Sequence, residues 1–102
     1  MIHELKDKVP SKYFNLWYRE DEHVYRLLTI TDGLVKLNDM AAYLWSLIDG
    51  KRTVEDIWNE ICGIFPMVDK EIIKKDVATV ISRLVEYEVI TLSWRKFGEE
   101  IL

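Results

Sequence analysis

The side chains that could carry catalysis or hold a metal ion are few in this chain. Nucleophilic catalysis needs a cysteine or serine beside a positioned base, but the one cysteine, Cys62, falls next to the apolar stripe of a predicted helix, where a small packing residue is expected. The two histidines, His3 and His23, have no companion at metal-ligand spacing. The acidic residues are scattered and the four glycines are isolated, so neither a carboxylate pair nor a phosphate loop is indicated. We expect no enzyme activity, no cofactor and no metal site.

The composition restricts the remaining classes of function. With 102 residues, of which 49% are hydrophobic, the chain is expected to fold as one domain spanning residues 1–102. No apolar run reaches the roughly 18 residues that cross a bilayer, and no apolar leader is visible. A lone cysteine excludes an internal disulfide, so a cytoplasmic protein without membrane contact is expected. The formal net charge of −4 opposes binding to a polyanion such as nucleic acid.

Strands are predicted in the first third of the chain. Residues 1–12 mix charges with Pro10 and show no period, so a loose arm is expected there. The aromatic run in residues 13–18 suits a pleated, half-buried surface and predicts the first strand. The charged residues 19–22 are expected to form a turn, and the partial alternation of residues 23–31 predicts a second strand.

A hairpin is predicted to follow the second strand. Asp32-Gly33 is a strong turn signal, because glycine adopts a positive φ without a steric clash. Residues 34–37 then return antiparallel as a short third strand. Since side chains alternate across a strand, Val35 and Leu37 face the core in one register, and their neighbours face it in the reverse register.

Three amphipathic helices are predicted between residues 37 and 90. At Asn38 the hydrophobic period changes from two to 3.6, and the asparagine side chain suits a helix N-cap. Asp49-Gly50 ends this first helix, with Gly50 suited to the left-handed C′ position. Thr53 starts the second helix with a variant of the capping box, in which Asp56 stands three residues later.

The second helix is predicted to end at Pro66, which lacks an N–H and disfavours a helical residue before it. Asp69 caps the third helix, which reaches about Glu86. The predicted inward residues are Met40, Ala41, Leu44, Trp45, Leu47 and Ile48 in the first helix, Val54, Ile57, Trp58, Ile61 and Phe65 in the second, and Ile73, Val77, Val80, Ile81 and Leu84 in the third.

The predicted fold class is α+β, a three-stranded antiparallel sheet followed by three helices. Residues 89–94 are β-branched and aromatic, so a short C-terminal strand is a candidate there. The core of the domain is expected to span about residues 13–90, with residues 91–102 as a tail or an extra strand.

Two functions fit this predicted fold, DNA binding and peptide binding, and they differ in what the third helix contacts. A winged helix-turn-helix transcriptional regulator would place it against DNA, but its cations are interspersed with acids, which leaves few uncompensated charges for phosphates. An extended peptide could instead add to the free edge of the strand at residues 34–37, a row of unpaired N–H and C=O groups. The cations are Lys70, Lys74, Lys75 and Arg83, and the acids are Asp69, Glu71, Asp76, Glu86 and Glu88.

Four short motifs occur along the chain in a defined order: Leu37-Asn38, Asp49-Gly50 with Arg52-Thr53, Asp76-Val77 leading to Leu84, and Val89-Ile90. In order and spacing they resemble the pyrroloquinoline quinone synthesis protein D family, the precursor-peptide recognition elements of ribosomal-peptide modification. The resemblance covers roughly residues 13–90 and is strongest over residues 37–53.

The resemblance implies a winged helix-turn-helix variant without catalytic residues. Members of this family bind the leader segment of a precursor peptide as a strand beside the third strand, in a cleft bounded by the third helix. They present it to a modifying enzyme, which in the namesake pathway is a radical S-adenosylmethionine protein. The segment after residue 90 matches no family motif, and covering an edge, forming a homodimer and joining an enzyme are its candidate roles.

The resemblance places the strand edge on residues 34–37 and leaves the flank of the third helix open. With Val77 at the centre of the buried face and 100° per residue, four residues lie on one flank, and Asp76, Arg83 and Tyr87 lie on the other. We expect the first flank to border the cleft, because its apolar members could contact leader side chains and its lysine could contact acidic ones. The alternative is that these residues only pack the domain. The predicted peptide-binding residues are Leu34, Val35, Lys36, Leu37, Lys74, Ala78, Ile81 and Val85.

Overall fold

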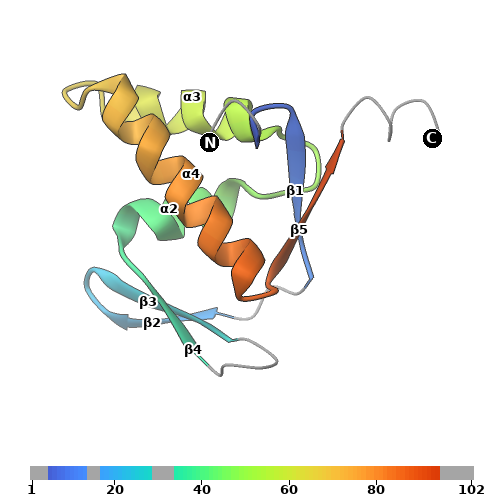
Figure 1. Ribbon diagram of the computed structural model, residues 1–102. Coiled ribbons are helices and arrows are strands. Elements are labelled where there is room, and N and C mark those ends of the chain that lie inside the picture. The colour runs from blue at the N-terminus through green and yellow to red at the C-terminus, as the bar shows by residue number, and fades with distance from the viewer. Residues whose placement is uncertain (1–4, 14–16, 29–33, 95–102) are drawn as a thin grey trace.

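Two antiparallel sheets and three helices make up the part of the chain that the computed structural model describes, residues 5–13, 17–28 and 34–94 (Figure 1). The predicted α+β class is confirmed, with two sheets in place of one. The elements in chain order are β1 (Lys8–Lys12), β2 (Trp17–Asp21), β3 (Val24–Leu28), β4 (Leu34–Leu37), α2 (Asp39–Leu47), α3 (Val54–Ile64), α4 (Lys70–Glu86) and β5 (Ile90–Trp94).

The three-stranded sheet has the order β2-β3-β4, so β4 lies at an edge. In the β3–β4 pair, Arg26 is opposite Lys36 and Tyr25 is opposite Leu37. Leu37 is buried and Lys36 is exposed, so of the two registers that the sequence left open, the strand has the one that turns Val35 and Leu37 toward the core. The predicted Asp32-Gly33 turn lies outside the described residues.

The predicted end of the first strand was wrong, and residues 14–16 of that prediction lie outside the described residues. We expected a strand at residues 13–18 and a charged turn at residues 19–22, but β2 runs through the charged residues to Asp21. Charged side chains fit this edge strand because they stay in solvent and pair locally: Arg26 Nε of β3 lies 2.6 Å from Glu20 Oε2. The register shifts between Arg19 and Asp21, as in a β-bulge.

The prediction of a loose arm for residues 1–12 was also wrong over residues 8–12, which form β1. β1 pairs antiparallel with β5, with Pro10 opposite Leu92, and both Val9 and Pro10 are buried. The partner strand lies about 80 residues away, so no local pattern could indicate the pairing. The short C-terminal strand that was a candidate is β5.

The predicted helix starts are confirmed by their caps. Asn38 Oδ1 accepts a hydrogen bond from Ala41 N–H at 2.9 Å, and Asp69 Oδ1 accepts one from Glu71 N–H at 2.8 Å. Thr53 and Asp56 form both bonds of a capping box. At the end of α2 one detail differs, since Ile48 is the C-cap and Gly50, with φ of +76°, stands two residues further on.

One hydrophobic core joins β3, β4, the three helices and the start of β5. Figure 1 shows α4 running diagonally from the α3–α4 turn toward the start of β5, with the three-stranded sheet at the lower left. No helix in the described ranges is long and apolar enough to cross a membrane. Of the predicted inward residues, all are buried except four that are partly buried, namely Met40, Trp58, Phe65 and Val80.

Candidate functional site

The outer edge of β4 faces a groove that α4 borders. No strand pairs with this edge among the described residues, so its outward N–H and C=O groups can pair with another chain. The groove, called here the β4–α4 groove, has a volume of about 320 Å³. It is lined by Arg26, Val35, Lys36, Leu37, Asn38, Ala41, Val80, Arg83, Leu84 and Tyr87.

The groove has an apolar floor and a polar rim. Leu37 and Leu84 are buried, and Val35 and Val80 are partly buried. At the rim Lys36 and Arg83 are exposed, and Tyr87, the C-cap of α4, is 36% exposed. An apolar floor beside an open strand edge suits an extended peptide, because backbone bonds form along the edge and alternate side chains enter the groove.

Three of the predicted strand residues, Val35, Lys36 and Leu37, line this groove. The side chain of Leu34, the fourth, lies outside the described set, although its backbone belongs to β4. None of the four predicted residues of α4 is among the lining residues.

The four predicted residues of α4 belong to the helix flank that turns away from the groove. Ala78 and Ile81 are 2% and 0% exposed and pack in the core. Lys74 Nζ lies 5.2 Å from the centroid of the Trp58 ring of α3, and Val85 is 38% exposed. Their contact with a peptide stays a prediction.

The flank of α4 that borders the groove is the one with Arg83 and Tyr87. Spacing along a helix fixes the angle between two side chains, but not the rotation of the helix against the sheet. Arg26 was not predicted from the sequence, and the register of β3 against β4 brings it opposite Lys36. Assigning the register of the hairpin between residues 23–31 and 34–37 would have placed Arg26 beside the predicted strand edge.

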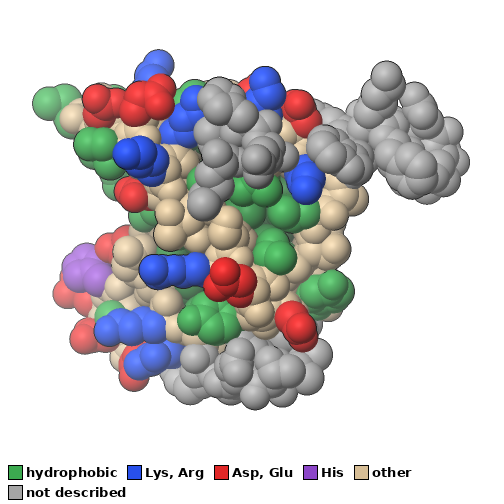
Figure 2. Space-filling model, viewed as in Figure 1, with side chains coloured by type: hydrophobic (Ala, Val, Ile, Leu, Met, Phe, Trp, Pro, Cys, Tyr) green, Lys and Arg blue, Asp and Glu red, His purple; other side chains and the backbone are tan. Residues whose placement is uncertain are grey.

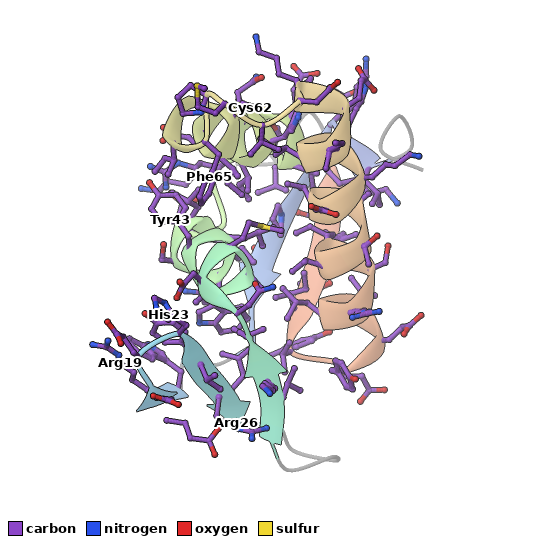
Figure 3. The ribbon with its side chains drawn as sticks, turned by 90° about the vertical axis from the view of Figure 1, so that its left-hand side faces the viewer. Arg19, His23, Arg26, Tyr43, Cys62 and Phe65 are labelled. Carbon is purple, nitrogen blue, oxygen red and sulfur yellow. The ribbon has the colours of Figure 1, made fainter. Side chains whose placement is uncertain are left out.

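A second hollow lies between α2 and the three-stranded sheet and is named here the aromatic pocket. Its volume is about 530 Å³, larger than the groove, but it opens between a helix and the face of the sheet, where the strands pair with one another. Figure 3 shows two residues on this side of the domain, His23 and Tyr43. The pocket is lined by Lys12, Trp17, Tyr25, Leu27, Leu37, Asp39, Ala42, Tyr43, Trp45 and Ser46.

The pKa of Lys12 in the aromatic pocket departs from its usual value. Burial lowers the pKa of Lys12, against the opposing effect of the Asp49 carboxylate, and Lys12 Nζ lies 4.6 Å from the centroid of the Trp45 ring. His23 Nδ1 lies 2.6 Å from Asp39 Oδ2 at the surface. Both of these contacts are between side chains.

Metal ligands and the single cysteine were two of the kinds of catalytic candidate considered from the sequence. They contain no group of three or more His, Cys, Asp or Glu side chains that could hold a metal ion. Cys62 is partly buried, as the sequence predicted, and burial raises the pKa of its thiol, which disfavours the nucleophilic thiolate.

Comparison with known proteins identifies the family. The model of the family "Coenzyme PQQ synthesis protein D (PqqD)" matches residues 25–90. The chain belongs to this family. The match runs from β3 to the first residue of β5 and includes every residue that lines the β4–α4 groove. The family named from four short motifs is therefore confirmed.

Curated relatives match a shorter stretch of the chain. A PqqA binding protein of Pseudomonas savastanoi pv. phaseolicola is 51% identical over 37 residues, which are 36% of this chain and 39% of that protein. A PqqA binding protein of Pseudomonas syringae pv. syringae is 49% identical over 37 residues, with the same coverage. A PqqA binding protein of Rahnella aquatilis is 38% identical over 47 residues, 46% of each chain. The chain thus covers less than half the length of these relatives, and no solved structure matches it.

Proposed function

We propose that the chain binds the leader segment of a ribosomally made precursor peptide as a strand added to β4. The observation that carries this proposal is the unpaired edge of β4 beside a groove lined by α4, within the residues that the family model matches. An added strand lies about 4.8 Å from β4, which places alternate side chains of the peptide over the apolar floor of the groove.

Other strand edges are poorer candidates. β2 lies at the opposite edge of the same sheet, but its register shifts between Arg19 and Asp21, and bulges of this kind protect edges from pairing. β2 and β1 also lie outside the matched residues 25–90. The edge of β4 combines a regular strand with a groove inside the matched residues.

The partner proposed for this edge follows from the relatives. Three of them carry the name PqqA binding protein, which supports a precursor peptide as the ligand. The proposed role is non-catalytic: the chain holds the peptide in the cytoplasm and presents it to a peptide-modifying enzyme such as a radical S-adenosylmethionine protein.

We assign the fold to a variant of the winged helix-turn-helix, in which α4 walls a groove instead of contacting DNA. The mixture of charges along α4 supports this use. Its first turn carries Glu71, its last turn carries Arg83, and the exposed residues between them include both Lys75 and Asp76. Such a surface attracts phosphates weakly.

A titration of the isotope-labelled chain with the precursor peptide encoded near its gene tests the proposal. Amide shifts are expected to concentrate on Val35, Lys36 and Leu37 and on the groove flank of α4 around Arg83 and Tyr87. Unchanged shifts at these residues on saturation would remove the proposal. Sedimentation velocity of the same complex distinguishes a monomer from the homodimer that the sequence left open.

A further inference from the structure

The β4–α4 groove is positively charged in a chain that is negative as a whole. Its ten lining residues include three cations, Arg26, Lys36 and Arg83, and no aspartate or glutamate. The formal net charge of the chain is −4. Figure 2 shows Lys and Arg side chains interspersed with Asp and Glu side chains over the region where Figure 1 places the three-stranded sheet. The lining of the groove itself is cationic, against the overall charge of the chain.

Two of these cations oppose each other within the sheet. Arg26 of β3 is directly opposite Lys36 of β4, and side chains in such pairs lie on the same face with Cβ atoms roughly 5 Å apart. Like charges in this position destabilise the pairing. Arg26 has an ion pair with Glu20, whereas Lys36 forms none with the described residues.

A strand added beside β4 would change the surroundings of Lys36. The residue of that strand opposite Lys36 lies on the same face of the sheet, on the side away from Arg26, at a similar separation. A carboxylate there pairs with the lysine and offsets its repulsion with Arg26. A lysine or arginine there would place three like charges in a row across three strands.

The third cation stands on the other wall of the groove. Arg83 is exposed in the last turn of α4 and forms no ion pair with the described residues. A guanidinium can bind a carboxylate through two parallel N–H donors. The sheet thus presents Lys36 and the helix presents Arg83 to a peptide that runs between them, and neither cation has an ion pair with the described residues.

We propose that the groove selects a leader segment in which acidic and apolar residues alternate, with carboxylates beside Lys36 and Arg83. This inference rests on the proposed function, since it names the chemistry of the strand that adds to β4. The apolar residues of the segment lie over the floor around Leu37, Val80 and Leu84.

Three synthetic peptides of equal length test this selectivity. All three carry valine at alternate positions, and the remaining positions carry glutamate, glutamine or lysine. Each is titrated into the intact chain by fluorescence anisotropy at low and at high salt. Exposed ion pairs contribute about 0.2–1 kcal/mol each, so two pairs predict that the glutamate peptide binds about 2- to 30-fold more tightly than the glutamine peptide. The lysine peptide is expected to bind weakest.

Variants assign the selectivity to the two cations. In the double variant Lys36→Gln and Arg83→Gln, the preference for glutamate over glutamine is expected to fall to within about twofold. Both residues are exposed, so the fold should persist, which circular dichroism checks. The matched control is Lys75→Gln, which removes an exposed lysine of α4 that does not line the groove. This control should keep the full preference.

The outcomes test the selectivity for acidic peptides separately from strand addition to β4. Equal binding of the glutamate and glutamine peptides overturns the selectivity and leaves strand addition standing, as does a preference that survives in the double variant. If none of the three peptides binds, the selectivity is also overturned, and the proposed function then depends on whether the precursor peptide itself shifts the amides of β4.

Discussion

At the scale of single residues, Gly50 holds a backbone conformation that a β-carbon would strain. Its φ is +76°, and a β-carbon there would lie 3.2 Å from Ser11 Oγ. Its N–H donates to Pro10 O at 3.2 Å, which ties the α2–α3 connection to β1. Gly50→Ala is expected to lower the free energy of unfolding by about 1–2 kcal/mol, measured by urea denaturation.

The control for Gly50 is a glycine in an ordinary conformation. Gly63 lies inside α3, and a β-carbon there would meet no atom within 4 Å. Because glycine in a helix is less favourable than alanine by about 0.5–1 kcal/mol, Gly63→Ala should stabilise the chain. Two changes of the same sign would contradict this account of the α2–α3 connection.

Thr53 joins two hydrogen bonds at the start of α3. Its Oγ1 accepts from Asp56 N–H at 3.1 Å, and its own N–H donates to Asp56 Oδ2 at 3.0 Å. Thr53→Ala removes the first bond at a buried position and is expected to lower the free energy of unfolding by about 1 kcal/mol. Thr79→Ala, at an exposed position inside α4, is the control and should cause no loss.

Asp49 gives the stability a defined dependence on acid. The backbone N–H of Arg52, that of Lys51 and the Arg52 guanidinium hold the pKa of this carboxyl below its usual value. A lowered pKa means that the carboxylate adds stability above the pKa of the unfolded chain, near pH 4. That stability is lost as the pH falls through the lower pKa of the folded chain.

Asp49→Asn tests this dependence. The amide keeps an oxygen that can accept from the two N–H groups but does not titrate. The melting temperature of the variant should therefore fall less between pH 5 and pH 2 than that of the parent chain. Parallel curves for the two proteins over this range would show that Asp49 does not contribute as described.

At the scale of secondary-structure elements, the rotation of α4 decides which residues reach the groove. Tyr87 and Val85 are almost equally exposed, at 36% and 38%, but only Tyr87 lines the groove. Tyr87→Ala is expected to weaken binding of the precursor peptide about fivefold or more, as truncation of an interfacial aromatic residue often does. Val85→Ala should change it less than twofold. Calorimetric titration measures the affinity of each variant for the peptide. A larger loss for Val85→Ala than for Tyr87→Ala would assign binding to the other flank of α4, the one expected from the sequence.

The elements that the sequence predicted are those with local signals. Asn38, Thr53 and Asp69 cap their helices with bonds to residues two or three positions away, so a short window contains the whole interaction. The strand at residues 34–37 was predicted with its bounds, because the turn signal before it and the N-cap after it are local. Its register stayed open, and the burial of Leu37 beside the exposed Lys36 decides it.

The elements that were missed depend on distant partners. β1 forms only because β5 pairs with it across most of the chain, and Pro10 gave no local sign of a strand. The β4–α4 groove likewise depends on contacts between residues far apart in the sequence. Its strand was found from the sequence, but the contribution of α4 depends on how the helix packs against α2, α3 and β5, which no spacing rule contains.

At the scale of the whole molecule, the distribution of charge separates peptide binding from DNA binding. The chain is negative overall, whereas Lys36 and Arg83, which form no ion pair with the described residues, line a groove beside a strand edge. We expect no binding to duplex DNA at low salt, where nonspecific binding to phosphates is strongest. Fluorescence anisotropy with a labelled duplex checks this, and an affinity that rises steeply as the salt concentration falls would support the regulator instead.

The central claim is that the precursor peptide becomes a strand beside β4. Intermolecular nuclear Overhauser effects between an unlabelled peptide and the isotope-labelled chain test it most directly. The claim predicts backbone contacts in a regular two-residue period from the peptide to Val35, Lys36 and Leu37, together with contacts from peptide side chains to Tyr87. Contacts to Trp17 and Tyr43 of the aromatic pocket, with none to the backbone of β4, would contradict it.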